Sequence, residues 1–240
     1  MKIVGHRADY DRTGILRKAE RFRSRGRVKR AIREYERVLA VDPEDIEVHT
    51  KVAQLYIRAR RKDQAKASLK RVIEWNEKEG FVDKAIGMLR VAQELDRRDL
   101  TVYLRLAELY LGKEVTGDAL RLLEGARRAF RRKRFRKEAI AVEEKILSFA
   151  PDDFRAQVSF VRLLWRVGRK YEAEERLWQM EAHWALMKNK ENWRKTRWLL
   201  CRHAPSVSTC WGSFISLFTS PVPYGGKTGS RVKRDEAQRR

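Results

Sequence analysis

Residues 46–73 read IEVHTKVAQLYIRARRKDQAKASLKRVI, and residues 100–127 read LTVYLRLAELYLGKEVTGDALRLLEGAR. The two stretches align without a gap at a shift of 54 positions, and the alignment continues to residue 153. The residues that recur in register are Ala53 on Ala107, Tyr56 on Tyr110, Ala65 on Ala119, Leu69 on Leu123, Phe81 on Phe135, Ala85 on Ala139, Ile86 on Ile140 and Asp99 on Asp153. A period of this length predicts stacked units, each of which buries its neighbour's apolar face.

Apolar residues between and before these stretches recur at helical spacing. From Arg12 onward, one helical face precedes a turn at Gly26 and a second face follows it. Asp42 stands before Pro43, which ends the second helix because the residue before proline is disfavoured in the α region. With only 13 Gly and 5 Pro in 240 residues, the composition also favours helix.

These helical hairpins resemble the tetratricopeptide repeat family. Steps of 34 residues, the family's period, are counted from Arg12, Ile46, Leu100 and Phe154. Most of the family's small, aromatic and proline positions are then met by residues of a suitable kind: Ala31, Tyr35, Pro43, Ala53, Tyr56, Ala65, Ala107, Tyr110, Ala119, Val161, Leu164 and Ala173. The family's first aromatic survives only as Tyr103, and the middle units have 54 residues. The resemblance implies an all-α, right-handed superhelical solenoid of antiparallel helix pairs.

The predicted organisation has three parts. Residues 1–11 form an N-terminal tail, and residues 12–187 form the repeat domain, with units 12–45, 46–99, 100–153 and 154–187. In the two middle units a third helix is expected, at 81–95 and at 135–149. The helices at 63–78 and 117–131 would then each belong to two overlapping 34-residue repeats. Residues 188–240 form a basic, tryptophan-containing extension with a helix at 192–202 and irregular structure from 204 onward.

The chain carries 56 Lys and Arg against 33 Asp and Glu, a net charge of +23. This charge indicates an acidic protein, nucleic acid or anionic lipid as partner, unless it serves only to keep the protein in solution. Neither of the two cysteines lies in a paired-cysteine motif, which is typical of a reducing compartment. No apolar run suits a secretory signal or a membrane span. We therefore expect a cytoplasmic protein.

Eight of the eleven residues 127–137 are basic, and none is acidic. They are Arg127, Arg128, Arg131, Arg132, Lys133, Arg134, Arg136 and Lys137. A helix end of this charge could bind phosphates or the carboxylates of an acidic protein. Solvated cations at the negative end of a helix dipole are the simpler interpretation. A second cluster at 17–30 adds to the case for an anionic partner.

In tetratricopeptide arrays the first helix of each pair lines the concave surface. Transferred to this chain, the resemblance implies a partner-binding groove that includes Glu20, Arg23, Gln54, Arg58, Arg105, Glu108, Arg162 and Trp165. Some family members clamp a chaperone's C-terminal carboxylate with Lys and Asn at fixed inner positions. Here only Arg105 matches that set, so we do not expect this activity, and binding of an extended or helical peptide stays open.

Tryptophans are concentrated in the C-terminal part of the chain. Trp165, Trp178 and Trp184 are expected to pack the last hairpin. Residues 192–218 combine further tryptophans with basic residues, which suits a membrane interface or a stacking platform for single-stranded nucleic acid. A helix that caps the exposed end of the array is the simpler interpretation.

No motif in the sequence indicates catalysis or a metal centre. Cys201, His203 and Cys210 fall short of the four ligands of a structural zinc site. The chain has no glycine-rich phosphate loop, HExxH motif or elbow serine. We therefore expect no enzymatic activity, no metal and no cofactor.

Fold and charge together predict a scaffold or adaptor that binds an acidic or extended segment of another protein in its concave groove. The alternatives are nucleic-acid binding through the clusters at 17–30 and 127–137, and peripheral membrane association through 192–218. The sequence leaves the oligomeric state open.

Overall fold

The computed structural model describes residues 10–203, 205, 207–216 and 219. The elements assigned in this part of the chain are twelve α-helices and one short 3-10 helix, η1. They are α1 (Arg12–Ser24), α2 (Val28–Val41), α3 (Ile46–Arg58), α4 (Lys62–Lys78), α5 (Val82–Leu95), α6 (Leu100–Gly112), α7 (Thr116–Ala129), η1 (Lys133–Phe135), α8 (Arg136–Phe149), α9 (Phe154–Arg166), α10 (Lys170–Leu186), α11 (Lys190–His203) and α12 (Val207–Ile215). The predicted all-α solenoid class is confirmed.

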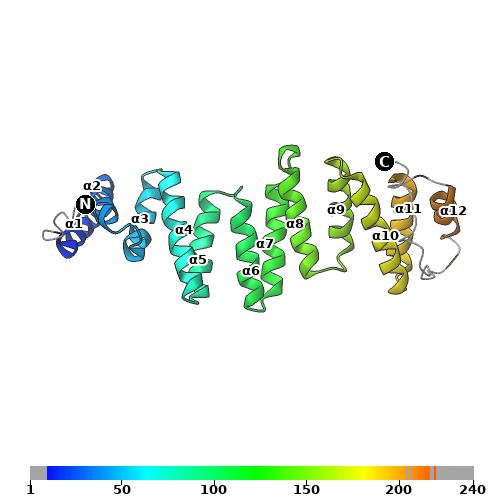
Figure 1. Cartoon of the computed structure of the whole chain (residues 1–240), viewed down its shortest axis with the longest axis horizontal. Helices are drawn as coiled ribbons and strands as arrows, with labels where there is room; N and C mark the ends of the chain where they lie inside the picture. Colours follow the sequence, from blue (N-terminus) through cyan, green and yellow to red (C-terminus); the bar gives the residue numbers. More distant parts are fainter. Residues whose placement is uncertain (1–9, 204, 206, 217–218, 220–240) are drawn as a thin grey trace, which may run out of the picture. The chain divides into compact units, whose positions relative to one another are not determined.

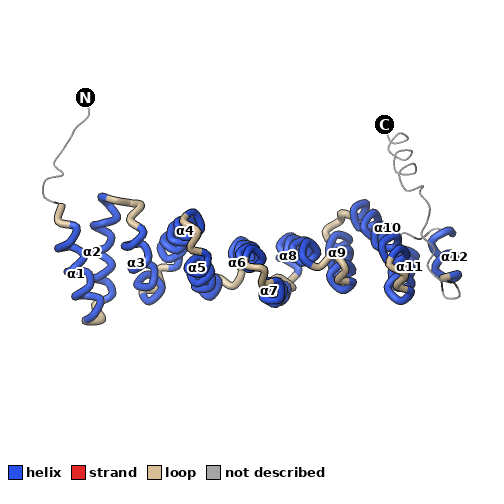
Figure 2. Tube along the Cα trace, turned by 90° about the horizontal axis from the view of Figure 1, so that it is seen from below, coloured by secondary structure: helices blue, strands red, loops and turns tan. Residues whose placement is uncertain are grey.

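The helices belong to two compact units, which meet in the sequence between Ala129 and Phe130. In the first unit, each helix from α1 to α7 packs against the next one along the chain (Figures 1 and 2). The alanines expected at the helix crossings, Ala53, Ala65, Ala107 and Ala119, are at most 1% exposed. Small side chains at these positions let neighbouring helices approach closely.

Short turns connect the helices, and local chemistry sets their ends. The Asp45 carboxylate accepts a hydrogen bond from Val48 N at 3.1 Å, which caps the N-terminus of α3. The turns after α1, α3, α6 and α9 each place one residue in the left-handed region: Gly26, Arg60, Glu114 and Gly168, with φ of 68°, 58°, 61° and 89°. Two of the four are therefore non-glycine residues in a conformation that favours glycine.

The helix lengths reveal a regularity that the sequence alone had not suggested. α3, α4 and α5 contain 13, 17 and 14 residues, and α9, α10 and α11 have the same three lengths. α11 therefore corresponds to α5, and we propose that the third three-helix unit spans 154–203 rather than ending at 187. The sequence of α11 resembles those of α5 and α8 only weakly, because Trp193 stands where the earlier units have Ala85 and Ala139.

The second unit contains α8 to α12, which also pack in chain order. Its core includes Phe160, Leu164, Leu177 and Leu200. The expected packing role of Trp184 is confirmed, since its side chain is 4% exposed, whereas the role expected of Trp178 is wrong because that side chain is 39% exposed. Trp165 is half-buried at the edge of the same core.

Two expected boundaries need correction. The helix expected at 117–131 ends at Ala129, before a segment of four consecutive basic residues. Irregular structure was expected from residue 204 onward, but α12 forms at Val207–Ile215 because it packs against α11, and packing overrides weak helix propensity. Residues 220–240 and most of the predicted N-terminal tail lie outside the described residues. Tyr10 packs against the core next to α1, and Asp11 caps that helix.

Candidate partner-binding site

The predicted groove begins on α1, where Glu20 and Arg23 lie one helical turn apart. Tyr35 Oη donates a hydrogen bond to Glu20 Oε1 at 2.6 Å, and Arg23 Nε donates to Glu20 Oε2 at 2.6 Å. Partial burial raises the pKa of Glu20, but these two hydrogen bonds outweigh it and the net pKa is lowered. Glu20 is therefore a structural carboxylate that already has its partners.

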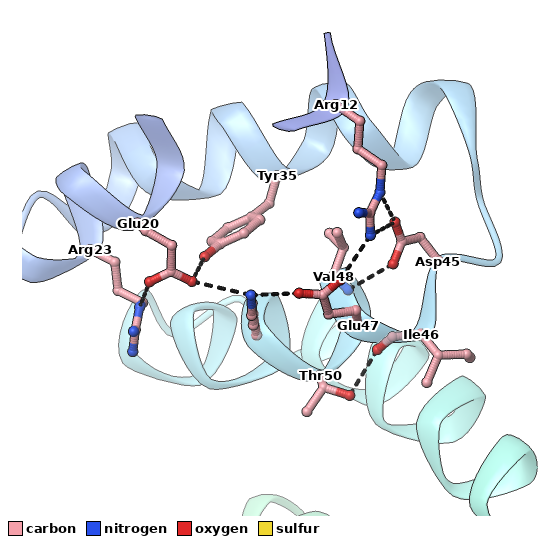
Figure 3. A network of polar contacts seen from close by, with 10 residues as sticks. Arg12, Glu20, Arg23, Tyr35, Asp45, Ile46, Glu47, Val48 and Thr50 are labelled. Atoms are coloured by element: carbon pink, nitrogen blue, oxygen red, sulfur yellow. Dashed lines mark hydrogen bonds and ion pairs between the residues drawn. The ribbon is translucent and has the colours of Figure 1, made fainter. Parts of the chain in front are cut away.

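The same carboxylate begins a chain of charges that crosses from α1 to α3 (Figure 3). Lys51 Nζ lies 3.6 Å from Glu20 Oε1 and 2.8 Å from Glu47 Oε1. Arg12 continues the chain, with contacts of 2.9 Å to Glu47 and 2.7 Å to Asp45. Acids and bases alternate along this chain, so its positive and negative charges balance.

Arg105, on α6, is also neutralised within the protein. Its Nε lies 2.7 Å and 2.8 Å from the two carboxylate oxygens of Glu77, on α4. The hydrogen bond to Glu77 is the main reason why the pKa of Arg105 is raised. Glu108, Gln54 and Arg58 are exposed.

The last two predicted groove residues lie in the second unit. Arg162 is exposed, and Trp165 is half-buried with its ring centroid 4.8 Å from that of His203. Lys170 Nζ also lies near this aromatic pair, 5.8 Å from the centroid of the Trp165 ring. The eight predicted residues are thus divided between two units. Glu20 and Arg23 form an ion pair.

The basic cluster at 127–137 is divided in the same way. Arg127 and Arg128 belong to the last turn of α7, and the remaining six basic residues belong to the second unit. Arg134 lies 4.7 Å from the centroid of the Phe135 ring, and Arg136 donates a hydrogen bond to the carbonyl of Arg166 at 3.0 Å. The residues 131–134 are all exposed.

The cluster at 17–30 divides into engaged and unengaged cations. Lys18 pairs with Glu34 at 3.1 Å, and Arg23 pairs with Glu20. Four exposed arginines lie at the C-terminal ends of α1 and α3: Arg25, Arg27, Arg58 and Arg60. We call them the cationic edge. Among the described residues, no carboxylate forms an ion pair with any of the four. α1 and α3 run in the same direction, with α2 antiparallel between them, so both ends lie at one edge of the first unit (Figure 2).

The basic, aromatic stretch at 192–218 is partly buried. Trp193 is 5% exposed and donates a hydrogen bond to Glu181 at 2.9 Å. Arg197 is held by Glu181 at 2.8 Å, and Arg194 Nε donates to the carbonyl of Ser216 at 2.7 Å. Only Trp198 and Trp211 of this stretch's tryptophans are exposed, at 55% and 64%. Membrane association through 192–218 stays a prediction.

Sequence reasoning missed Glu181, which is 3% exposed and organises α10 and α11. A glutamate among apolar positions gives little sequence signal until the buried Trp193 and Arg197 are seen to face it. Among the described residues, no group of three or more His, Cys, Asp and Glu could hold a metal ion. Nor does any described helix combine the length and apolar character needed to cross a membrane.

Residues 22–80 match the sequence profile of the tetratricopeptide repeat family. This segment is a tetratricopeptide repeat region. The matched segment covers the C-terminal end of α1 and all of α2, α3 and α4. It includes the cationic edge and Lys51 of the charge chain. In general, tetratricopeptide repeat proteins are interaction scaffolds without catalytic activity.

Several solved structures are similar to this chain. The crystal structure of MamA is 22% identical, with 68% of this chain and 86% of MamA covered and a TM-score of 0.26. YrrB, described as a TPR protein with an unusual peptide-binding site, is 15% identical over 59% of this chain and 88% of its own, with a TM-score of 0.26. A thermophilic TPR protein from Thermus thermophilus is 15% identical over 86% of this chain and 99% of its own, with a TM-score of 0.25. No protein of curated function matches the chain significantly.

Proposed function

We propose that this chain is a non-enzymatic scaffold that binds an acidic segment of a partner protein at the first unit. The cationic edge supplies the charge for this contact, and Gln54 on α3 supplies an exposed amide beside it. One observation carries the proposal: Lys18, Arg23, Lys51 and Arg105 pair with carboxylates of the protein itself, whereas the four arginines of the cationic edge face solvent. Unpaired charge of one sign steers a partner of the opposite sign and fixes its register.

The conformation of Arg60 supports the proposal. Its φ of 58° is one that glycine adopts at the corresponding positions 26 and 168. A left-handed conformation costs about 1–2 kcal/mol in a residue with a Cβ atom. A residue other than glycine in this conformation is a candidate for a functional role, and Arg60 adds its charge to the edge.

The simpler explanation for cations at a helix C-terminus is the helix dipole, and it applies to part of the edge. Arg58 lies in the last turn of α3, where a cation is favourable. Arg27 precedes the N-terminus of α2, and Arg60 precedes that of α4, where the dipole disfavours positive charge. The dipole therefore accounts for Arg58. Arg27 and Arg60 lie between the C-terminus of one helix and the N-terminus of the next, where the two dipoles act in opposite senses.

A fluorescently labelled Glu-rich peptide and a Gln-rich peptide of the same length would test the proposal by fluorescence anisotropy. We expect the full chain to prefer the acidic peptide. The triple variant Arg25→Glu, Arg58→Glu, Arg60→Glu should weaken its binding at least about tenfold.

The matched control is Arg155→Glu, Lys188→Glu, Lys190→Glu, which changes the net charge equally at positions of the second unit. We expect this control to bind nearly as well as the original chain. Equal loss in both triple variants would mean that net charge, and not the cationic edge, attracts the peptide. That result would reject the proposed site.

Nucleic-acid binding is the second candidate, and the exposed run at 131–134 favours it. Phosphate contacts release counterions, so affinity for a single-stranded RNA probe should fall steeply with salt concentration. Reversing the charges at Arg131, Arg132 and Arg134 should then reduce the steepness of that fall. A shallow salt dependence that these substitutions leave unchanged would remove this candidate.

A further inference from the structure

The only two cysteines of the chain lie on neighbouring helices with their sulfur atoms in contact. Cys201 belongs to the last turn of α11, and Cys210 lies in α12. Both are free thiols, and their Sγ atoms are 2.7 Å apart. Cys210 is exposed and Cys201 is half-buried, so reagents in solution can reach the pair.

The pair belongs to an ordered contact between the two helices. Arg194 Nε on α11 donates to the carbonyl of Ser216 at 2.7 Å, and Ser213 Oγ on α12 donates to the carbonyl of Arg197 at 2.7 Å. Positions 194, 197 and 201 thus meet positions 216, 213 and 210 in antiparallel order. The cysteines form the third step of this series, so their approach follows from the register of the two helices.

We propose that Cys201 and Cys210 are a modification site, a reversible disulfide that fastens α12 to α11. In the reduced form, the contacts of Arg194 and Ser213 hold α12 at this face. In the oxidised form, a covalent bond closes the segment between the two cysteines and removes conformations in which α12 leaves α11. The exposed Trp211 and Phe214 of α12 are then held at a fixed place.

A small-molecule disulfide such as oxidised glutathione can serve as oxidant. The thiolate of the exposed Cys210 attacks one sulfur of that disulfide, forms a mixed disulfide and releases one reduced thiol. The thiolate of Cys201 then attacks Cys210 Sγ, breaks the mixed bond and releases the second thiol. The two cysteines lose two electrons and two protons, and the two released thiols gain them.

The test follows thiol oxidation in the full chain by maleimide trapping and intact mass at several ratios of oxidised to reduced glutathione. A matched variant, Cys210→Ser with Trp211→Cys, keeps two thiols at nearly the same sequence separation. It turns the second thiol to another side of α12, because successive helical residues point in different directions. The original chain should lose two hydrogen atoms per molecule without forming intermolecular disulfides.

We expect the original chain to close its disulfide at least about tenfold faster than the variant under native conditions. In denaturant the two rates should be similar, because the loops to be closed are nearly equal in length. Slower hydrogen exchange in α12 after oxidation, absent in Cys210→Ser, should accompany closure. Equal native rates, or mixed and intermolecular disulfides as the only products, would overturn the proposal.

Discussion

Alanine at the helix crossings sets how closely neighbouring helices approach in this chain. Ala107 in α6 and Ala119 in α7 are both fully buried, and both recur from the preceding unit at the same spacing. A larger side chain at either position has no space to occupy without moving a helix. The repeat of small residues is therefore a packing requirement.

The substitution Ala107→Trp should destabilise the first unit by overpacking, by about 1–3 kcal/mol. Chemical denaturation followed by circular dichroism would measure the change in the free energy of unfolding. Ala40→Trp, at an exposed position of α2, is the control and should have little effect. An unchanged denaturation midpoint for Ala107→Trp would show that the residue does not lie at a tight crossing.

Arg60 offers a test in which stability and binding should change in opposite directions. Arg60→Gly removes the cost of the left-handed conformation and should stabilise the protein by about 1 kcal/mol. It also removes a charge from the cationic edge, so the acidic peptide should bind less tightly. The measurements are the denaturation midpoint and the dissociation constant of the peptide.

Glu114→Gly is the matched control, because Glu114 has a φ of 61° in the corresponding turn after α6 but lies outside the cationic edge. It should stabilise the protein to a similar extent without weakening the binding of the peptide. Weaker binding in both variants would implicate flexibility of the turns, whereas unchanged binding in Arg60→Gly would contradict the role given to its charge.

At the scale of elements, a buried polar cluster and a ring contact join α11 to α10 and α9, beside the apolar packing of α11 in the core. Glu181 accepts hydrogen bonds from Trp193 and Arg197, and His203 lies against Trp165. The first contact ties α11 to α10, and the second ties it to α9. Both can be tested by changing a single side chain.

Glu181→Ala should destabilise the second unit by about 3–5 kcal/mol, because it leaves Arg197, whose side chain is 13% exposed, without its counter-charge. Replacing both Glu181 and Arg197 by methionine should recover most of that loss. Glu175→Ala, at an exposed position of α10, is the control and should stay within about 0.5 kcal/mol of the original chain. A similarly small effect of Glu181→Ala would mean that the ion pair is not formed in solution.

Acidification should weaken the contact of His203. Burial lowers the pKa of this imidazole below its usual 6.5, and the nearby Arg202 and Arg162 add to the effect. A lowered pKa means that the unfolded chain binds the proton more tightly, so this contribution is fully present above pH 6.5 and is lost as the pH falls through the folded-state pKa. The free energy of unfolding of His203→Gln should therefore depend less on pH between about 7.5 and about 5 than that of the original chain.

Most of the fold could be predicted from the sequence, because helical spacing and small residues at crossings are local signals. The candidate site was less predictable. Arg105 was expected in the groove, but it binds Glu77, which lies 28 positions earlier on another helix. Such a pairing depends on how the helices are rotated about their axes, and the sequence pattern does not determine that rotation closely enough. Reversing the charge of Arg105 would consequently oppose Glu77 and test folding more than binding.

At the scale of the whole molecule, the chain consists of two compact units, and α11 completes the core of the second. Trp193, Leu199 and Leu200 of α11 are each at most 5% exposed. Full burial of a large apolar side chain contributes about 1.5–3 kcal/mol. A repeat domain that ended at residue 187 would expose the surface that these three side chains cover.

Truncation can distinguish whether the repeat domain ends at residue 187 or at residue 203. A chain that ends at residue 203 should keep the cooperative unfolding of the second unit. A chain that ends at residue 187 should lose several kcal/mol of stability, because the three buried side chains of α11 are absent. Thermal unfolding of the two chains beside the full protein would measure the difference, and equal stability would show that α11 is an accessory cap.

An odd number of helices per unit has a consequence for any ligand that follows the array. Each helix runs opposite to its neighbour. The helices α3 and α6, which begin the repeat units 46–99 and 100–153, therefore point in opposite directions. An extended ligand that contacts both helices would meet the carboxyl-terminal end of one and the amino-terminal end of the other. Identical contacts could not then be repeated from unit to unit. Each repeat unit would have to bind a different chemical group of the ligand. Such an array suits a ligand whose successive segments differ rather than one with a repeated sequence.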